Sequence, residues 1–131
     1  MEPDRLSRSP ELVAILSQAG EQSAARAACH VALDAAGLDD ARAIDALRVL
    51  TESGPALSRH ETAKRMCEEF DAAAWNANDS DDYDLWFRRA RAAAALSLAH
   101  EDAASEAVYE AAHAFGDVDA FEDALRDELA L

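Results

Sequence analysis

The chain has 131 residues, half of them hydrophobic, and a net charge of −15 at pH 7. It is long enough to bury one core, and no apolar run in it is long enough to cross a bilayer. Direct binding to nucleic acid is not expected, because phosphate contacts require a basic surface.

Helix-forming residues dominate the composition. Alanine, the strongest helix former, accounts for 33 residues, and no stretch alternates apolar with polar side chains as a half-buried strand does. The sequence predicts an all-α protein, a compact bundle of six to seven short antiparallel helices that forms a single domain over residues 1–131. Residues 1–8 are expected to be a flexible N-terminal tail. The start of the chain has no signal-peptide pattern, so a cytoplasmic location is expected.

Solitary glycines divide the helical patterns. Pro10 follows Ser9, which is the typical opening of a helix at its cap and first turn. Each glycine then follows a helical pattern, where a left-handed C-terminal cap is favoured. The four glycines are Gly20, Gly37, Gly54 and Gly116. The expected helices run roughly over residues 10–19, 21–36, 39–53, 58–77, 82–99, 101–115 and 117–130.

Two details of this division concern helix ends. Ser58 and Glu61, three residues apart, match a capping box, which places the start of the fourth helix there. The fifth and sixth helices are separated only by "HED", so one long helix remains an alternative. A faint repeat aligns residues 24–41 with residues 103–120, each ordered as helix, glycine, acidic cap and helix, which favours two pseudo-repeated helical halves.

The stretch "NANDSDDYDLWFRRAR", residues 76–91, concentrates carboxylates and arginines. A calcium EF-hand needs glycine at position six and glutamate at position twelve, and counting from Asp79 places Asp84 and Ala90 there. The stretch is instead predicted to be a polar connection followed by a helix capped by Ser80 or Asp82. The arginines of "RRAR" are expected to pair within the chain with the aspartates that precede them.

Negative charge is concentrated in the second half. Residues 1–65 hold ten acids and eight bases, whereas residues 66–131 hold seventeen acids and four bases. Three interpretations compete: solubility, adaptation to a salty cytoplasm, and an acidic face for a basic partner. Salt adaptation predicts acid throughout the chain, which the first half does not show. Asp127 and Glu128 lie in the last turn of the last helix, where carboxylates oppose the helix dipole. Either a frayed helix end, where this cost disappears, or a role beyond stability would explain them.

We therefore predict a non-catalytic interaction module that docks a basic partner protein, in an immunity, antitoxin or nucleic-acid-mimic role. No cofactor is expected. The apolar faces of the first and last helices allow a homodimer contact as well. The expected partner-binding residues are Glu106, Tyr109, Glu110, Asp119, Glu122 and Asp123.

A metal-binding protein or a small helical enzyme is the alternative. Glu110 and His113 form a Glu-x-x-His pair, and Glu106 shares their helix face. Di-iron bundles use two such pairs and two further glutamates, and only one pair is present here, so no metal is the preferred expectation. The two cysteines, Cys29 and Cys67, are expected to be buried free thiols. The remaining histidines, His60 and His100, are expected to be surface or helix-end residues.

Overall fold

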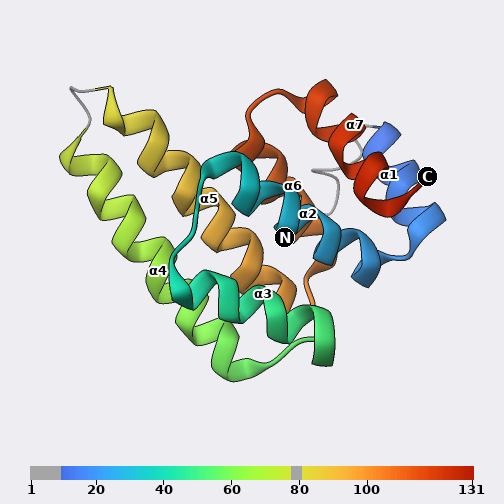
Figure 1. The fold of residues 1–131 in the computed structure, drawn as a ribbon, viewed down its shortest axis with the longest axis horizontal. Helices are drawn as coiled ribbons and strands as arrows, with labels where there is room; N and C mark the ends of the chain where they lie inside the picture. The colour runs from blue at the N-terminus through green and yellow to red at the C-terminus, as the bar shows by residue number, and fades with distance from the viewer. Residues whose placement is uncertain (1–9, 78–80) are drawn as a thin grey trace.

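A computed structural model describes residues 10–77 and 81–131. In these residues the chain forms seven α-helices and no strand, which confirms the all-α prediction (Figure 1). The expected tail at residues 1–8 and the candidate cap Ser80 lie outside the described residues. The helices are α1 (Pro10–Ala19), α2 (Glu21–Ala36), α3 (Ala41–Ser53), α4 (Leu57–Asn76), α5 (Asp82–His100), α6 (Ala104–Phe115) and α7 (Val118–Leu129).

The helices pack around a central group made of α2, α5 and α6. The longest pair, α4 and α5, lies side by side as an antiparallel hairpin on one side of the molecule (Figure 1). On the other side α7 packs against α2, α6 and α1, while α3 crosses between α2 and the α4–α5 hairpin. Short connections of this kind place consecutive helices against one another, as expected for a bundle.

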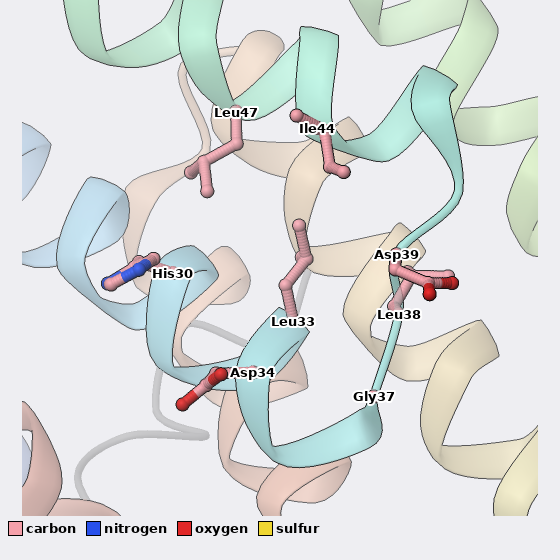
Figure 2. Close-up of a pocket in the computed structure, with 8 residues that line it drawn as sticks. All are labelled: His30, Leu33, Asp34, Gly37, Leu38, Asp39, Ile44 and Leu47. Atoms are coloured by element: carbon pink, nitrogen blue, oxygen red, sulfur yellow. The ribbon is translucent and has the colours of Figure 1, made fainter.

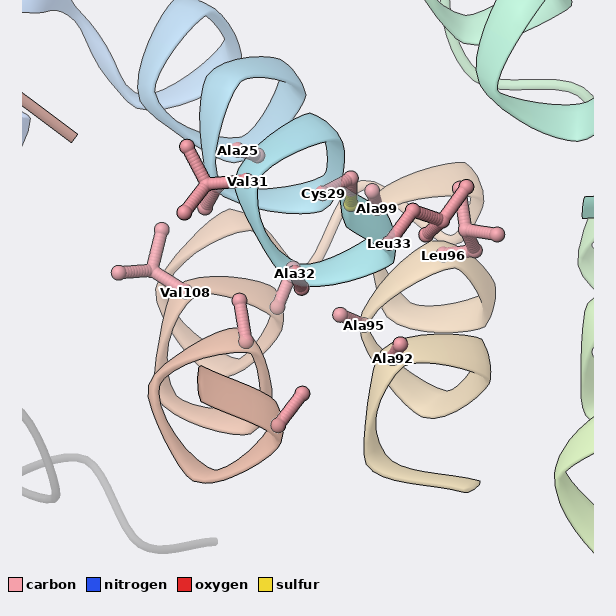
Figure 3. Packing of buried hydrophobic residues seen from close by; sticks show 14 of the residues in the cluster. Ala25, Cys29, Val31, Ala32, Leu33, Ala92, Ala95, Leu96, Ala99 and Val108 are labelled. Atoms are coloured by element: carbon pink, nitrogen blue, oxygen red, sulfur yellow. The ribbon is translucent and has the colours of Figure 1, made fainter. Parts of the chain in front are cut away.

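Alanine fills the seam where α2, α5 and α6 meet. Five of the alanines there are completely buried, and Figure 3 shows Ala32 of α2 lying between α5 and α6. An alanine side chain ends at Cβ, so helices that meet through alanine can approach closely. Larger side chains close the two sides of this seam, with Met66 on α4 and Phe121 on α7 both fully buried. The five alanines are Ala28, Ala32, Ala95, Ala107 and Ala111.

The end of α2 follows the predicted glycine chemistry. Gly37 adopts the left-handed conformation at φ 63° and ψ 36°. Its N–H donates to the carbonyl of Asp34, and the N–H of Leu38 donates to the carbonyl of Leu33 at 2.9 Å. This pair of hydrogen bonds is the Schellman motif, which satisfies carbonyls that the end of a helix leaves without partners.

The same motif separates α5 from α6, without a glycine. Asp102 has a positive φ of 63°, its N–H donates to the carbonyl of Ala99, and the N–H of Ala103 donates to the carbonyl of Leu98. The fifth and sixth segments are therefore two helices, and the alternative of one long helix is excluded. A left-handed aspartate is uncommon but is tolerated better than most residues other than glycine.

The start of α4 differs from the predicted capping box. The helix begins at Leu57, one residue before Ser58, and its N-cap residue is Ala56, whose side chain has no hydrogen-bonding atom. The backbone N–H of Ala56 instead donates to Nδ1 of His100 at 3.0 Å. The hydrogen-bond partner at the start of α4 is therefore 44 positions away in the sequence, and a local sequence pattern cannot indicate it.

His100 lies at a helix end, as expected, but it is buried and not at the surface. Its side chain is 4 % exposed at the end of α5, and its Nε2 lies 2.7 Å from the carbonyl oxygen of Ala46 on α3. Because Nδ1 accepts from Ala56, Nε2 must carry the proton that is donated to Ala46. The neutral ring thus joins α3, the start of α4 and α5.

The two segments of the faint repeat share one local feature. Asp40 accepts a hydrogen bond from the N–H of Arg42 at the start of α3, and Asp117 accepts one from the N–H of Ala120 at the start of α7. The connections that precede these caps differ, since four residues separate α2 from α3 and two separate α6 from α7. A pseudo-repeat of the two halves stays a prediction.

Candidate partner-binding surface

The predicted residues on α6 are only partly open to solvent. Glu106, Tyr109 and Glu110 are all half-buried. Glu110 is engaged within the molecule, because its Oε2 lies 3.1 Å from Nη1 of Arg91 on α5 and its side chain is 16 % exposed. The negative charge of Glu110 is therefore largely compensated by Arg91.

On α7 the predicted residues divide into two groups. Asp119 and Asp123 are exposed, and the nearest cation to Asp123 is Arg126, at 3.8 Å. Glu122, however, is 6 % exposed. Most of the surface of Glu122 is therefore covered within the protein, and its role in partner binding stays a prediction.

The C-terminal third still presents a strongly acidic exterior. Residues 101–131 contain ten acids and, among lysine and arginine, only Arg126. All of these residues are described, and seven of the ten acids are exposed. The resulting surface is negative and has little local compensation. The seven are Glu101, Asp102, Asp117, Asp119, Asp123, Asp127 and Glu128.

The candidate metal ligands are not assembled into a site. His113 is exposed, its Nδ1 lies 3.0 Å from the carbonyl oxygen of Tyr109, and its ring packs against the tyrosine ring with centroids 4.4 Å apart. Glu110 is paired with Arg91. Across residues 10–77 and 81–131, no three His, Cys, Asp or Glu side chains are grouped so that they could hold a metal ion. The arrangement thus gives the metal alternative no support.

The arginines of the "RRAR" stretch do pair within the chain, but with unexpected partners. Arg88 donates to the carbonyls of Ala114 at 2.8 Å and Phe115 at 2.9 Å, at the end of α6. Its contact with the preceding Asp84 is long, at 4.0 Å. Cations at the C-terminal end of a helix are stabilised by the helix dipole.

Arg89 and Arg91 are also engaged. Arg89 donates to the carbonyls of Ala36 and Gly37, both at 3.2 Å, at the end of α2. Arg91 bridges two carboxylates, with Asp71 at 3.1 Å on one side and Glu110 at 3.1 Å on the other. These contacts hold the cluster against the bundle.

A groove between α2 and α3 combines apolar and acidic side chains. Figure 2 shows Leu33 of α2 pointing toward Ile44 and Leu47 of α3 across this groove, which has a volume of about 390 Å³. Leu38, from the connection between the two helices, also lines it. We call it the α2–α3 groove. Its titratable lining residues are His30, Asp34 and Asp39.

A second groove lies on the opposite side of the same exposed edge of α2. It has a volume of about 470 Å³ and shares His30 and Asp34 with the first. Its other acidic residues are Asp127 and Glu128 of α7, and Nδ1 of His30 lies 3.0 Å from Oε2 of Glu128. This α2–α7 groove therefore extends the acidic rim of the first groove. Its apolar lining comprises Val31, Ala35, Phe115 and Ala124.

A third groove, between α4 and α5, contains the nucleophile-type side chains. Ser97 Oγ lies 3.0 Å from Nδ1 of His60, but Ser97 is buried. Burial, together with the neighbouring carboxylate of Asp71, raises the pKa of the Cys67 thiol to about 11. A thiol with such a pKa is almost entirely protonated at neutral pH and is a poor nucleophile. The contacts of His60 with Ser97 join α4 to α5.

The sequence predicted an acidic surface but did not identify the groove residues. In the sequence, Ile44 and Leu47 belong to the apolar face of one helix. Asp34 is one of ten acids in residues 1–65, which also hold eight bases. Their juxtaposition depends on how α3 crosses α2, and single-sequence periodicity does not contain that information. One available signal was that His30 and Asp34, four apart, continue the polar face of a helix that also carries Gln22 and Arg26.

Comparisons with known proteins give no indication of function. No family model matches the chain, and neither a curated protein nor a solved structure matches it. None of the helices in the described part of the chain is both long and apolar enough to span a membrane.

Proposed function

We propose that this protein is a non-catalytic interaction module whose acidic surface docks a basic partner protein. The observation that carries the proposal is the exposure of seven of the ten acids in residues 101–131, with Arg126 as the only lysine or arginine among them. Such a field speeds association with a positively charged partner and disfavours binding of acidic ones. An inhibitor or immunity role would require only this type of surface.

Charge reversal at Asp119 and Asp123 tests the proposal. Both side chains are exposed, so the double substitution Asp119→Lys and Asp123→Lys is expected to leave the fold intact. Purified wild type and variant, immobilised at equal density, are exposed to lysate of the source cells in low salt. We expect the wild type to retain a basic protein that salt elutes. The double substitution should lower the amount retained at least about fivefold.

A matched control separates a defined face from total charge. The pair Glu61→Lys and Glu68→Lys changes the net charge equally on exposed positions of α4. Retention should survive this change. Equal loss in both variants would reduce the acidity to a non-specific effect, and failure of the wild type to retain any basic protein would reject the proposed function.

A further inference from the structure

We infer that the α2–α3 groove receives a basic amphipathic helix of the partner, with apolar side chains on the groove floor and cationic side chains against its rim. This inference rests on the proposed function, and it adds a place of docking and the form of the docked segment. The groove adjoins the acidic surface of residues 101–131 through His30, which lines the groove and contacts Glu128. Helices that lie in apolar grooves present residues at i, i+3, i+4 and i+7 to the floor.

The floor of the groove is apolar and accessible. Leu33 and Leu38 supply its base and are almost entirely buried, while Ile44 stands at its edge with 54 % of its surface exposed. Leu47 is partly buried beside them. An isoleucine so exposed leaves apolar surface in contact with water, and a docked apolar side chain would remove that surface from water.

The acidic residues at the rim of the groove favour a positively charged segment. The charged lining residues of the α2–α3 and α2–α7 grooves are the acids Asp34, Asp39, Asp127 and Glu128, and no lysine or arginine lines either groove within residues 10–77 and 81–131. Only His30, which contacts Glu128, adds a titratable base. A partner segment with lysine or arginine beside its apolar residues is complementary to this pattern.

The shape of the groove favours a helix over an extended segment. The walls are two helices, and the depression between them accepts the ridge of side chains on a third helix. An extended peptide that binds by strand addition would need a sheet edge to pair with, and the described residues contain no strand. From His30 to its end at Ala36, the α2 wall of the groove spans seven residues, about 10 Å at 1.5 Å per residue, which is about two helical turns.

A pair of synthetic peptides distinguishes this docking from simple charge attraction. One is a fluorescein-labelled peptide of about 14 residues made of leucine and lysine, with leucine at helical spacing so that one face is apolar. The other has the same composition in an order that produces no apolar face. We expect the wild-type protein to bind the patterned peptide at least about tenfold more tightly by fluorescence anisotropy at about 0.15 M salt.

Substitutions in the groove should remove that preference. Ile44→Ser, at an exposed position, should weaken binding of the patterned peptide about tenfold, whereas Leu57→Ser, at a residue that is 76 % exposed outside the groove, should not. Asp34→Asn with Asp39→Asn should weaken it more than the equally charged pair Glu61→Gln with Glu68→Gln.

The outcomes separate this inference from the proposed function. Equal binding of the two peptides, or equal effects of Ile44→Ser and Leu57→Ser, would overturn the groove assignment while leaving an acidic docking face intact. The absence of measurable binding of either peptide would also overturn it. Retention of a natural basic partner, measured with the Asp119 and Asp123 reversals, tests the proposed function independently of these results.

Discussion

His100 at the end of α5 donates a hydrogen bond from Nε2 to the carbonyl oxygen of Ala46 on α3, across 2.7 Å. The opposite ring nitrogen accepts from the backbone of Ala56, just before α4. One neutral imidazole therefore satisfies a buried carbonyl and an N–H group from two other segments. Protonation of Nδ1 would place an N–H against the N–H of Ala56, so the charged ring does not fit this position.

The stability of the protein should consequently depend on pH. Burial lowers the pKa of His100 below its ordinary value of 6.5, against the opposing effect of the hydrogen bond to Ala46. The unfolded chain then binds more protons than the folded one just below pH 6.5, so the stabilisation is complete above that pH and is lost as the pH falls towards the folded-state pKa. We expect urea denaturation to report a lower free energy of unfolding at pH 5.5 than at pH 7.5.

The variant His100→Gln isolates this contribution. Glutamine has a donor and an acceptor but does not titrate, so the slope between pH 7.5 and 5.5 should be reduced, with a loss of about 1–3 kcal/mol at pH 7.5 from imperfect geometry. Exposed His113→Gln is the control. A hydrogen bond from Arg42 lowers the pKa of the Asp40 carboxyl. Carboxylates of this kind change the free energy of unfolding at lower pH than His100 does. An unchanged slope in His100→Gln would contradict the assignment.

Arg88 should contribute more to the free energy of unfolding than an ordinary surface arginine does. Its guanidinium donates to two carbonyls at the end of α6 and lies 3.4 Å from the carbonyl oxygen of Ala35 near the end of α2. Arg88→Met removes these charge-assisted hydrogen bonds and is expected to lower the free energy of unfolding by about 1.5–3 kcal/mol in urea denaturation. Arg48→Met, which removes exposed ion pairs on α3, should cost less than about 1 kcal/mol. Equal losses in the two variants would show that the carbonyl contacts contribute nothing special.

Local chemistry explains which helix boundaries could be predicted. Gly37 signalled the end of α2 because a left-handed residue there is almost always glycine. Asp102 occupies the equivalent position after α5, and because its side chain gives only a weak signal, one long helix remained an alternative. Ser58 and Glu61 gave a false cap at α4, since the actual partner of the cap N–H is His100, which is distant in sequence.

The candidate site shows the same division between local and distant information. The count of acids in residues 101–131 predicted a mainly acidic exterior, and Asp119 and Asp123 are indeed exposed. The burial of Glu122 depends on how α7 is rotated against its neighbours, and that rotation is set by the complete packing arrangement. Likewise, the contacts of Arg88 with carbonyls of α2 and α6 join positions 26 to 53 residues apart.

Asp102 offers a stabilising substitution. A left-handed conformation costs a residue with a Cβ atom roughly 1 kcal/mol relative to glycine, and Asp102 has φ 63°. Asp102→Gly should raise the free energy of unfolding by about 0.5–1 kcal/mol, after subtraction of the exposed hydrogen bond from Gln22. Asp102→Ala should lower it, because alanine loses that hydrogen bond and keeps the strain. Thermal denaturation of the two variants provides the comparison, and opposite signs would refute the explanation.

The two cysteines should react slowly in the folded protein. Burial raises the pKa of Cys29 to about 12, and burial with Asp71 raises that of Cys67 to about 11. A two-unit increase reduces the thiolate fraction at neutral pH about a hundredfold, and the thiolate is the reactive form. Titration with a disulfide reagent at pH 7.5 should therefore show two thiols that react rapidly only after addition of denaturant. Rapid modification of either cysteine in the native protein would contradict this expectation.

The alanine seam between α2, α5 and α6 also determines how the molecule can respond to a bound partner. Side chains that end at Cβ have no rotamers to exchange, so this interior cannot adjust by local repacking. Movement there must take the form of small sliding displacements of complete helices, which keep their internal hydrogen bonds. If a bound partner displaces α2, we therefore expect α5 and α6 to move with it as rigid helices.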